Sequence, residues 1–99
     1  MKRTKTASER RYLAAVAALP CIVCMECLGQ LNHEVQVHHV KTRHGWGRSS
    51  HFDTLPLCWV HHQDQKYGVH GMGKEQFTAM YGKSEIELLQ IVKEKLHVE

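Results

Sequence analysis

The sequence predicts one small domain of the α+β class, and three observations support this prediction. The chain has 99 residues, which is the length of a single small domain. Apolar residues recur at helical spacing near both ends, whereas two short middle segments have the composition of strands. Cysteines and histidines come in closely spaced pairs, and seven of the nine histidines lie between Val37 and His70. Because so short a chain buries only a modest core, a metal ion held by these pairs would stabilise it.

The first helix is expected over residues 6–19. Thr6 and Glu9 have the spacing of a capping box, in which each side chain satisfies the other residue's backbone N–H. An apolar stripe follows through Val16, and Pro20 ends the helix because it cannot donate the next hydrogen bond. The segment CIVCMEC, residues 21–27, is then expected to form a tight turn.

Two short strands joined by a polar loop are expected in the middle of the chain. The segment EVQVHHV, residues 34–40, alternates valines with polar residues, as a strand does. The second strand is FDTLPLC, residues 52–58, and Pro56 confines it to an edge or an end because proline lacks an N–H. The polar segment KTRHGWGRSSH between them contains two glycines and is expected to be the loop. A further helix is expected to begin near Trp59.

Two helices are expected after a glycine-rich break at residues 68–73. They span residues 74–81 and 85–97, and Ser84 with Glu87 forms a second capping box. The last helix has an apolar stripe that should pack on the core. Its members are Ile86, Leu89, Val92 and Leu96.

Charge and cysteine content suggest a cytoplasmic protein with an anionic partner. The net charge of +3 is concentrated in a basic tail at residues 1–11, which suits a phosphate backbone or, equally, a solvated surface. No apolar run is expected to reach the length of a membrane span, and the N-terminus lacks the apolar stretch of a signal peptide. In a reducing cytosol, the four cysteines are expected to be metal ligands or free thiols.

Two pairs of soft ligands predict a structural zinc site. Cys21 and Cys24 are separated by two residues, as are Cys58 and His61. Four such nitrogen and sulfur ligands suit tetrahedral zinc. Cys27 has the same spacing from Cys24 and is an alternative to Cys21, which we prefer because Pro20 fixes the chain just before it.

The doubled histidines can each serve two sites. On a helix, His62 points about 100° away from His61, and on a strand His38 and His39 project to opposite faces. Hydrolysis of a phosphodiester needs an activated water and a cation that bears the developing charge. Histidine can supply both the base and the ligands. A strand–loop–strand–helix unit with one histidine base and two or three metal ligands is the ββα-metal arrangement.

The sequence also resembles a known family at these residues. The segments VHHV and DTLPLCWVHH resemble the HNH endonuclease motif. Together with CIVC, SSHFDTLPLC and GVHG, they are similar to the phage and prophage branch that includes the Ref group of RecA-dependent nucleases. The resemblance covers residues 19–82. It implies a single HNH nuclease domain over residues 1–99, with this core followed by a C-terminal helix at 84–97.

The resemblance implies a role for each histidine of the motif. His39 would be the general base that activates water, and His38 beside it a metal ligand or support. His62 would bind the catalytic cation, and His70 would complete that site. His61 stands where many relatives have a zinc-binding cysteine.

The middle residue of the motif stays open between two candidates. Asp53 occupies the usual asparagine position, and His51 stands where this narrower branch places its polar residue. Since they differ by two positions, both side chains could face the same side of a strand. Either could orient His39 or bind the ion.

These features predict a metal-dependent HNH endonuclease that hydrolyses DNA, with Mg²⁺ or Mn²⁺ as the catalytic ion and Zn²⁺ as the structural one. We expect nicking of low sequence specificity in phage or prophage DNA recombination within a bacterial host cell. Arg43 and Arg48 are expected to contact the DNA backbone. One alternative is a non-catalytic zinc-binding DNA module. Another is a nuclease active only with a RecA-type recombinase filament or with phage packaging machinery.

Overall fold

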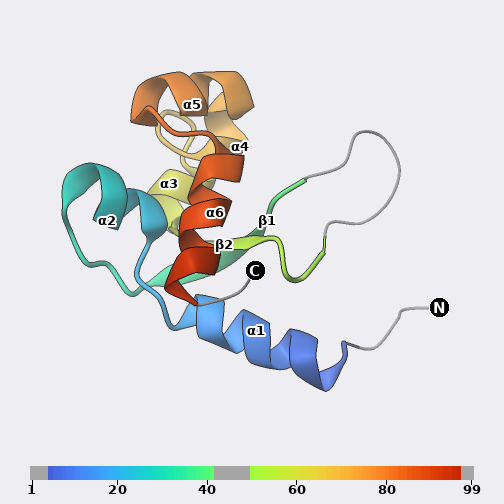
Figure 1. The fold of residues 1–99 in the computed structure, drawn as a ribbon. Coiled ribbons are helices and arrows are strands. Elements are labelled where there is room, and N and C mark those ends of the chain that lie inside the picture. The colour runs from blue at the N-terminus through green and yellow to red at the C-terminus, as the bar shows by residue number, and fades with distance from the viewer. Residues whose placement is uncertain (1–4, 42–49, 97–99) are drawn as a thin grey trace.

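The computed structural model describes residues 5–41 and 50–96, and it confirms the α+β class (Figure 1). Arg43, Arg48 and part of the basic tail lie outside the described residues. The elements in chain order are α1 (Ala7–Ala17), α2 (Ile22–Leu28), β1 (Val35–His39), β2 (Thr54–Cys58), α3 (Trp59–Gln63), α4 (Val69–Met72), α5 (Lys74–Tyr81) and α6 (Glu85–Lys95).

The two strands form an antiparallel hairpin that carries His38 and His39. The register pairs Val35 with Cys58 at one end and His39 with Thr54 at the other. Every residue of β2 is buried, as expected for a strand covered on both faces. Pro56 lies mid-strand, which is tolerated because each strand of this two-stranded sheet has a free edge.

Helices enclose this hairpin and build the core on it. In Figure 1, α1 lies below the hairpin and α6 crosses it, and both pack against β2. The helix α2 contacts β2 and α6, and α3 contacts both strands. The core side chains with no exposed surface come from α1, α2, β2, α5 and α6, and they include Val16, Ile22, Val23, Leu55, Leu57, Phe77, Leu88 and Val92.

Both predicted capping boxes are present. The Glu9 backbone N–H donates to Thr6 Oγ1 at 3.1 Å, and the Thr6 N–H donates to Glu9 Oε1 at 2.8 Å. Ser84 and Glu87 form the same reciprocal pair at 3.1 and 2.9 Å. These local bonds satisfy donors that a helix start leaves open, so the starts of α1 and α6 agree with the sequence to within one residue.

Three expectations about secondary structure and packing were wrong. The segment CIVCMEC is not a tight turn, because Ile22 begins a helix that ends at Gly29, whose φ of 64° suits glycine. The break at residues 68–73 contains α4, and a Cβ at Gly71 would lie 2.3 Å from the Asp64 carbonyl oxygen. In α6, Ile86 is 52% exposed, and Leu88 takes the core position beside Leu89.

The stretch Ala7–Leu28 also departs from the expectation that no apolar run reaches the length of a membrane span. By length and composition it could cross a membrane, with a mean hydropathy of 1.7 in its most apolar window. Core helices pass the same test. Here the stretch comprises α1 and α2 with a break between Ala17 and Ile22, and it brings Val16, Cys21 and Ile22 into the core around β2.

The contrast between two residues of α6 gives a test of this packing. Leu88→Ala should lower the free energy of unfolding by about 2–5 kcal/mol, because it leaves a cavity in the core. Ile86→Ala should change it by less than about 0.5 kcal/mol, because Ile86 is largely in solvent. Guanidinium denaturation measures both values. Equal losses for the two variants would contradict the observed helix orientation.

Candidate metal centres

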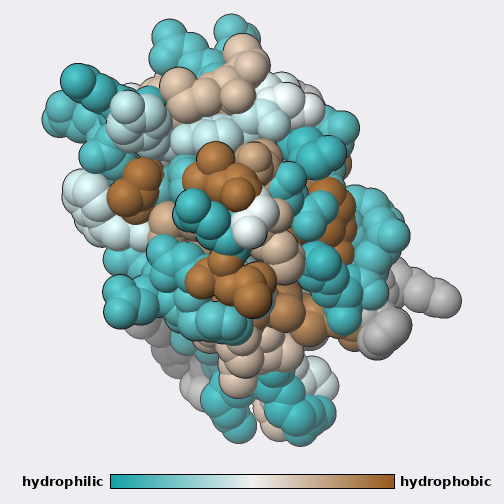
Figure 2. All heavy atoms as spheres, turned by 90° about the vertical axis from the view of Figure 1, so that its left-hand side faces the viewer, coloured by the Kyte–Doolittle hydropathy of each residue, from teal (hydrophilic) through white to brown (hydrophobic). Residues whose placement is uncertain are grey.

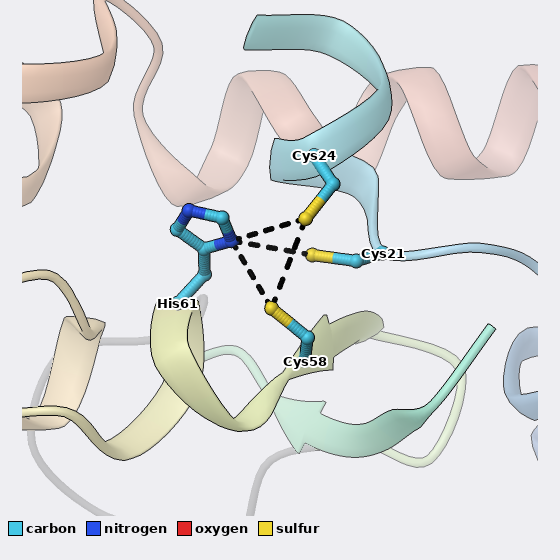
Figure 3. Close-up of side chains that lie close together, drawn as sticks. All are labelled: Cys21, Cys24, Cys58 and His61. Carbon is cyan, nitrogen blue, oxygen red and sulfur yellow. Dashed lines mark hydrogen bonds between the residues drawn. The ribbon is translucent and has the colours of Figure 1, made fainter. Parts of the chain in front are cut away.

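Three cysteines and a histidine converge where α2 meets the junction of β2 and α3 (Figure 3). All four side chains are buried, and their ligand atoms lie within 4.8 Å of one another. His61 Nδ1 is 3.6 Å from Cys21 Sγ, 3.4 Å from Cys24 Sγ and 3.2 Å from Cys58 Sγ. Cys21 and Cys24 lie at the start of α2, Cys58 and His61 lie at the start of α3, and the tertiary fold brings the two pairs together.

The geometry and chemistry of this cluster fit zinc. A tetrahedral ion with Zn–S bonds of about 2.3 Å places its sulfurs about 3.8 Å apart. The Cys24 and Cys58 sulfurs are separated by 3.8 Å. Burial raises the pKa of the Cys24 thiol to about 12 and also raises that of Cys21. A cation at the centre would reverse this effect and hold the ligands as thiolates, so the group is suited to a structural zinc ion.

The alternative cysteine lies outside the cluster. The Cys27 thiol donates to the Tyr81 carbonyl oxygen at 3.6 Å, and its side chain is half-buried. Because α2 is helical, Cys27 lies nearly one turn further along the helix than Cys24, which displaces its thiol along the helix axis. The structure therefore brings Cys21, and not Cys27, to the other three ligands.

An apolar groove borders the zinc-ligand cluster on the outside. It encloses about 610 Å³ and is lined by His61 together with Leu28, Val60, Tyr67 and Met80, all four substantially exposed. Figure 2 views the side of the molecule where α2 lies and shows apolar patches separated by polar side chains. One ligand of the zinc cluster is thus also part of a surface groove.

Three histidines form a second cluster on the other side of α3. His38 on β1, His62 on α3 and His70 on α4 offer ligand atoms within 4.8 Å of one another. His62 Nε2 lies 3.2 Å from His38 Nδ1 and 3.0 Å from His70 Nε2. His38 and His62 are buried and His70 is exposed, so the cluster opens to solvent on one side.

The outer partners of two of these histidines direct lone pairs into the cluster. His38 Nε2 is 2.9 Å from Glu85 Oε2, and His62 Nδ1 is 2.7 Å from Gln36 Oε1. Both oxygens are acceptors, so each of these ring nitrogens donates its N–H outward. His38 Nδ1 and His62 Nε2 are then left facing each other as acceptors, an arrangement that a shared cation would satisfy.

Burial keeps the central histidine of this cluster neutral. Burial, with His38 and His70 nearby, lowers the pKa of His62 to about 4. At neutral pH this imidazole therefore carries no proton on its inward nitrogen and can bind a metal ion. The donor set fits a divalent transition metal ion better than it fits Mg²⁺, which prefers oxygen ligands.

His39 belongs to a separate pair on the exposed side of β1. It projects to the face opposite His38, as the alternation of a strand predicts. His39 Nε2 lies 2.9 Å from His51 Nδ1. Burial lowers the pKa of His39, and the nearby His51, His38 and Lys5 lower it further. His39 is therefore largely unprotonated at neutral pH.

The two candidates for the middle position have different neighbours. His51 contacts His39, whereas the Asp53 carboxylate accepts a hydrogen bond from Lys93 Nζ at 3.0 Å. The Asp53 backbone carbonyl also accepts from the Val40 N–H at 2.8 Å. The structure thus places His51 beside the expected base, and Asp53 against α6.

Sequence reasoning missed two residues at the histidine cluster. Gln36 lies two residues before His38 on the same strand, so the alternation of β1 was a usable signal for it. Glu85 lies on α6, 47 residues from His38 in the chain, and no local pattern connects the two.

Comparison with protein families identifies the chain. The family model described as recombination enhancement, RecA-dependent nuclease matches residues 5–97. The chain belongs to this family. It is therefore a nuclease, an enzyme that hydrolyses DNA, with a role in recombination, and the family name implies dependence on RecA. This confirms the resemblance read from the HNH-like segments.

Removal of a zinc ligand from this RecA-dependent nuclease should unfold it. Cys58→Ser should lower the zinc content of the purified protein by about one ion per chain and lower the melting temperature strongly, because an ion bound by these ligands links α2 to α3. Cys27→Ser should keep both the zinc and the fold, because Cys27 lies outside the cluster. Elemental analysis and thermal circular dichroism measure these outcomes. Loss of zinc in the Cys27 variant would contradict the assignment.

Proposed function

We propose that this RecA-dependent nuclease cuts DNA by one-metal hydrolysis, with the ion held by His38, His62 and His70. The observation that supports this is the convergence of three imidazole nitrogens, two of them with their lone pairs directed inward. A divalent ion bound there would stabilise the negative charge that develops on the phosphorane and on the leaving 3′ oxygen. His39 follows His38 directly on β1, so the two are adjacent in the chain, and the His39 ring lies on the other face of the strand beside His51.

His39 is the general base in this proposal, and His51 orients it. If His39 Nε2 donates its hydrogen to His51 Nδ1, the Nδ1 lone pair of His39 is left to take a proton from water. Its lowered pKa keeps the ring unprotonated before the reaction. His51, and not Asp53, then fills the middle position of the motif.

The catalytic ion is proposed to be Mn²⁺ or Mg²⁺, with Mn²⁺ favoured. Three imidazoles are poor partners for Mg²⁺, which is normally bound by carboxylates, phosphates and water. Mn²⁺ accepts nitrogen ligands more readily, and a histidine-rich site would also bind zinc or nickel. Cleavage should therefore be faster with Mn²⁺ than with Mg²⁺ at equal concentration.

The product is proposed to be a nick, made with low sequence specificity. One hydrolytic site cuts one strand at a time, so a double-strand break needs two events. The net charge of +3 suits contact with the phosphate backbone, which carries no sequence information directly. Arg43 and Arg48, outside the described residues, remain the proposed backbone contacts. We place this activity in the cytoplasm of a bacterial host, on phage or prophage DNA.

Cleavage beside a recombinase filament tests the proposal. The substrate is a supercoiled plasmid paired with a RecA filament on a homologous oligonucleotide, in Mn²⁺, Mg²⁺ or EDTA. Wild-type protein should convert the plasmid to open circles in a metal-dependent reaction. His39→Ala should reduce the rate by about 10²- to 10⁴-fold, the usual contribution of a general base.

The matched control is His33→Ala, which removes an exposed histidine that precedes β1 and should leave cleavage unchanged. Cleavage by His39→Ala at the wild-type rate would refute the assignment of the base. Absence of cleavage by the wild-type protein, with or without the filament, would favour the non-catalytic zinc module.

Two further variants separate the candidates for the middle position. His51→Ala should slow cleavage by about 10- to 100-fold, the loss typical of an orienting outer partner. Asp53→Asn should keep near-wild-type cleavage, because this carboxylate is paired with Lys93 on α6. The same plasmid assay measures both rates. The opposite order of the two variants would assign the role to Asp53.

A further inference from the structure

A buried carboxylate from the C-terminal helix lies against the histidine cluster. Glu85 is the first residue of α6, and only 8% of it is exposed. Its Oε2 atom lies 2.9 Å from His38 Nε2, and the two side chains are 9% and 7% exposed. Glu85 is outside residues 19–82, the region that resembles the nuclease motif.

Burial of this carboxylate needs a physical reason. An ionised carboxylate is costly to remove from water unless it is paired and hydrogen-bonded. The N-terminus of α6 favours a negative charge within its first turn, which offsets part of that cost. The hydrogen bond to His38 Nε2 offsets the rest, so the contact with His38 accounts for a buried carboxylate at this position.

The role follows from the two nitrogens of the imidazole ring. A carboxylate that accepts the Nε2–H fixes His38 in the tautomer whose Nδ1 lone pair points toward His62. It also makes that lone pair a stronger donor to a cation. In addition, three neutral imidazoles leave the full charge of a divalent ion uncompensated, and one carboxylate behind them halves the net charge of the buried group.

From this geometry we infer that Glu85 is a positioning residue of the metal centre, acting through His38 in a carboxylate–histidine–metal relay. The C-terminal helix is then part of the nuclease site and not only a cover for the core. The inference rests on the proposed function, in which His38, His62 and His70 hold the catalytic ion. Gln36 has the corresponding place behind His62 but is uncharged, so Glu85 is the larger contributor.

The test measures metal affinity separately from cleavage. Protein that carries one zinc ion per chain is titrated with Mn²⁺ in a calorimeter, for the wild type and for Glu85→Gln, Glu85→Ala and Glu87→Gln. Glu85→Ala should bind Mn²⁺ about 10- to 100-fold more weakly, as expected for loss of an outer-shell partner. Glu85→Gln keeps an acceptor but loses the charge, so its affinity should be intermediate.

Glu87→Gln is the matched control, because it removes the same charge from the same helix turn on the exposed side and keeps an acceptor for the Ser84 N–H. Its Mn²⁺ affinity should equal that of the wild type. Zinc content and circular dichroism check that each variant is folded. If both Glu85 variants bind Mn²⁺ as the wild type does, the inference is overturned.

Two more measurements distinguish failure of this inference from failure of the proposed function. His62→Ala should lose Mn²⁺ binding altogether, and wild-type affinity in that variant would refute the metal site itself. Nitrogen-15 NMR of the wild-type protein at pH 8 reports the tautomer of His38 without any substitution. The Nε2–H form is expected, and the Nδ1–H form would overturn the role of Glu85 even if the Glu85 variants did not fold.

Discussion

The convergence of Cys58 and His61 with Cys21 and Cys24 fixes the point at which β2 becomes α3. A helix of five residues has little stability of its own, so α3 depends on this anchoring. His62 is the next residue, and its side chain leaves the helix about 100° from that of His61. The cluster that suits zinc therefore determines the direction in which His62 enters the second cluster. Loss of an ion bound there would remove the scaffold of the proposed nuclease site together with the fold.

The strand β1 likewise directs two adjacent histidines to two different sites, one on each face of the strand. His38 is turned inward to His62, and His39 is turned outward to His51. In a strand, neighbouring side chains point to opposite faces of the sheet. Backbone pairing with β2 keeps β1 in register along its full length. A slip of one residue would exchange the inward and outward positions. The buried face of the hairpin opposes such a slip, because it would bring His39 into the core.

The helix α6 contacts the β1–β2 hairpin and the segment before β2 through two charged side chains. Glu85 in its first turn contacts His38, and Lys93 in its last turn contacts Asp53 just before β2. Leu88, Leu89 and Val92 lie between them in the core. Each charged residue is also at the helix end that the macrodipole favours for its sign. The C-terminal helix thus links β1 to the segment that leads into β2, and it supplies the carboxylate that we assign to the metal centre.

The sequence by itself determined the features that depend on residues close together in the chain. Spacing of two residues identified both halves of the zinc-ligand cluster, capping boxes located the starts of α1 and α6, and residue composition located both strands. The tertiary structure alone decided which of several similar side chains meet. It selected Cys21 over Cys27 and placed His51, not Asp53, beside His39. It also revealed Glu85 behind His38. Those contacts depend on how α2, β1 and α6 pack together, and packing between distant segments leaves no period or spacing in the sequence.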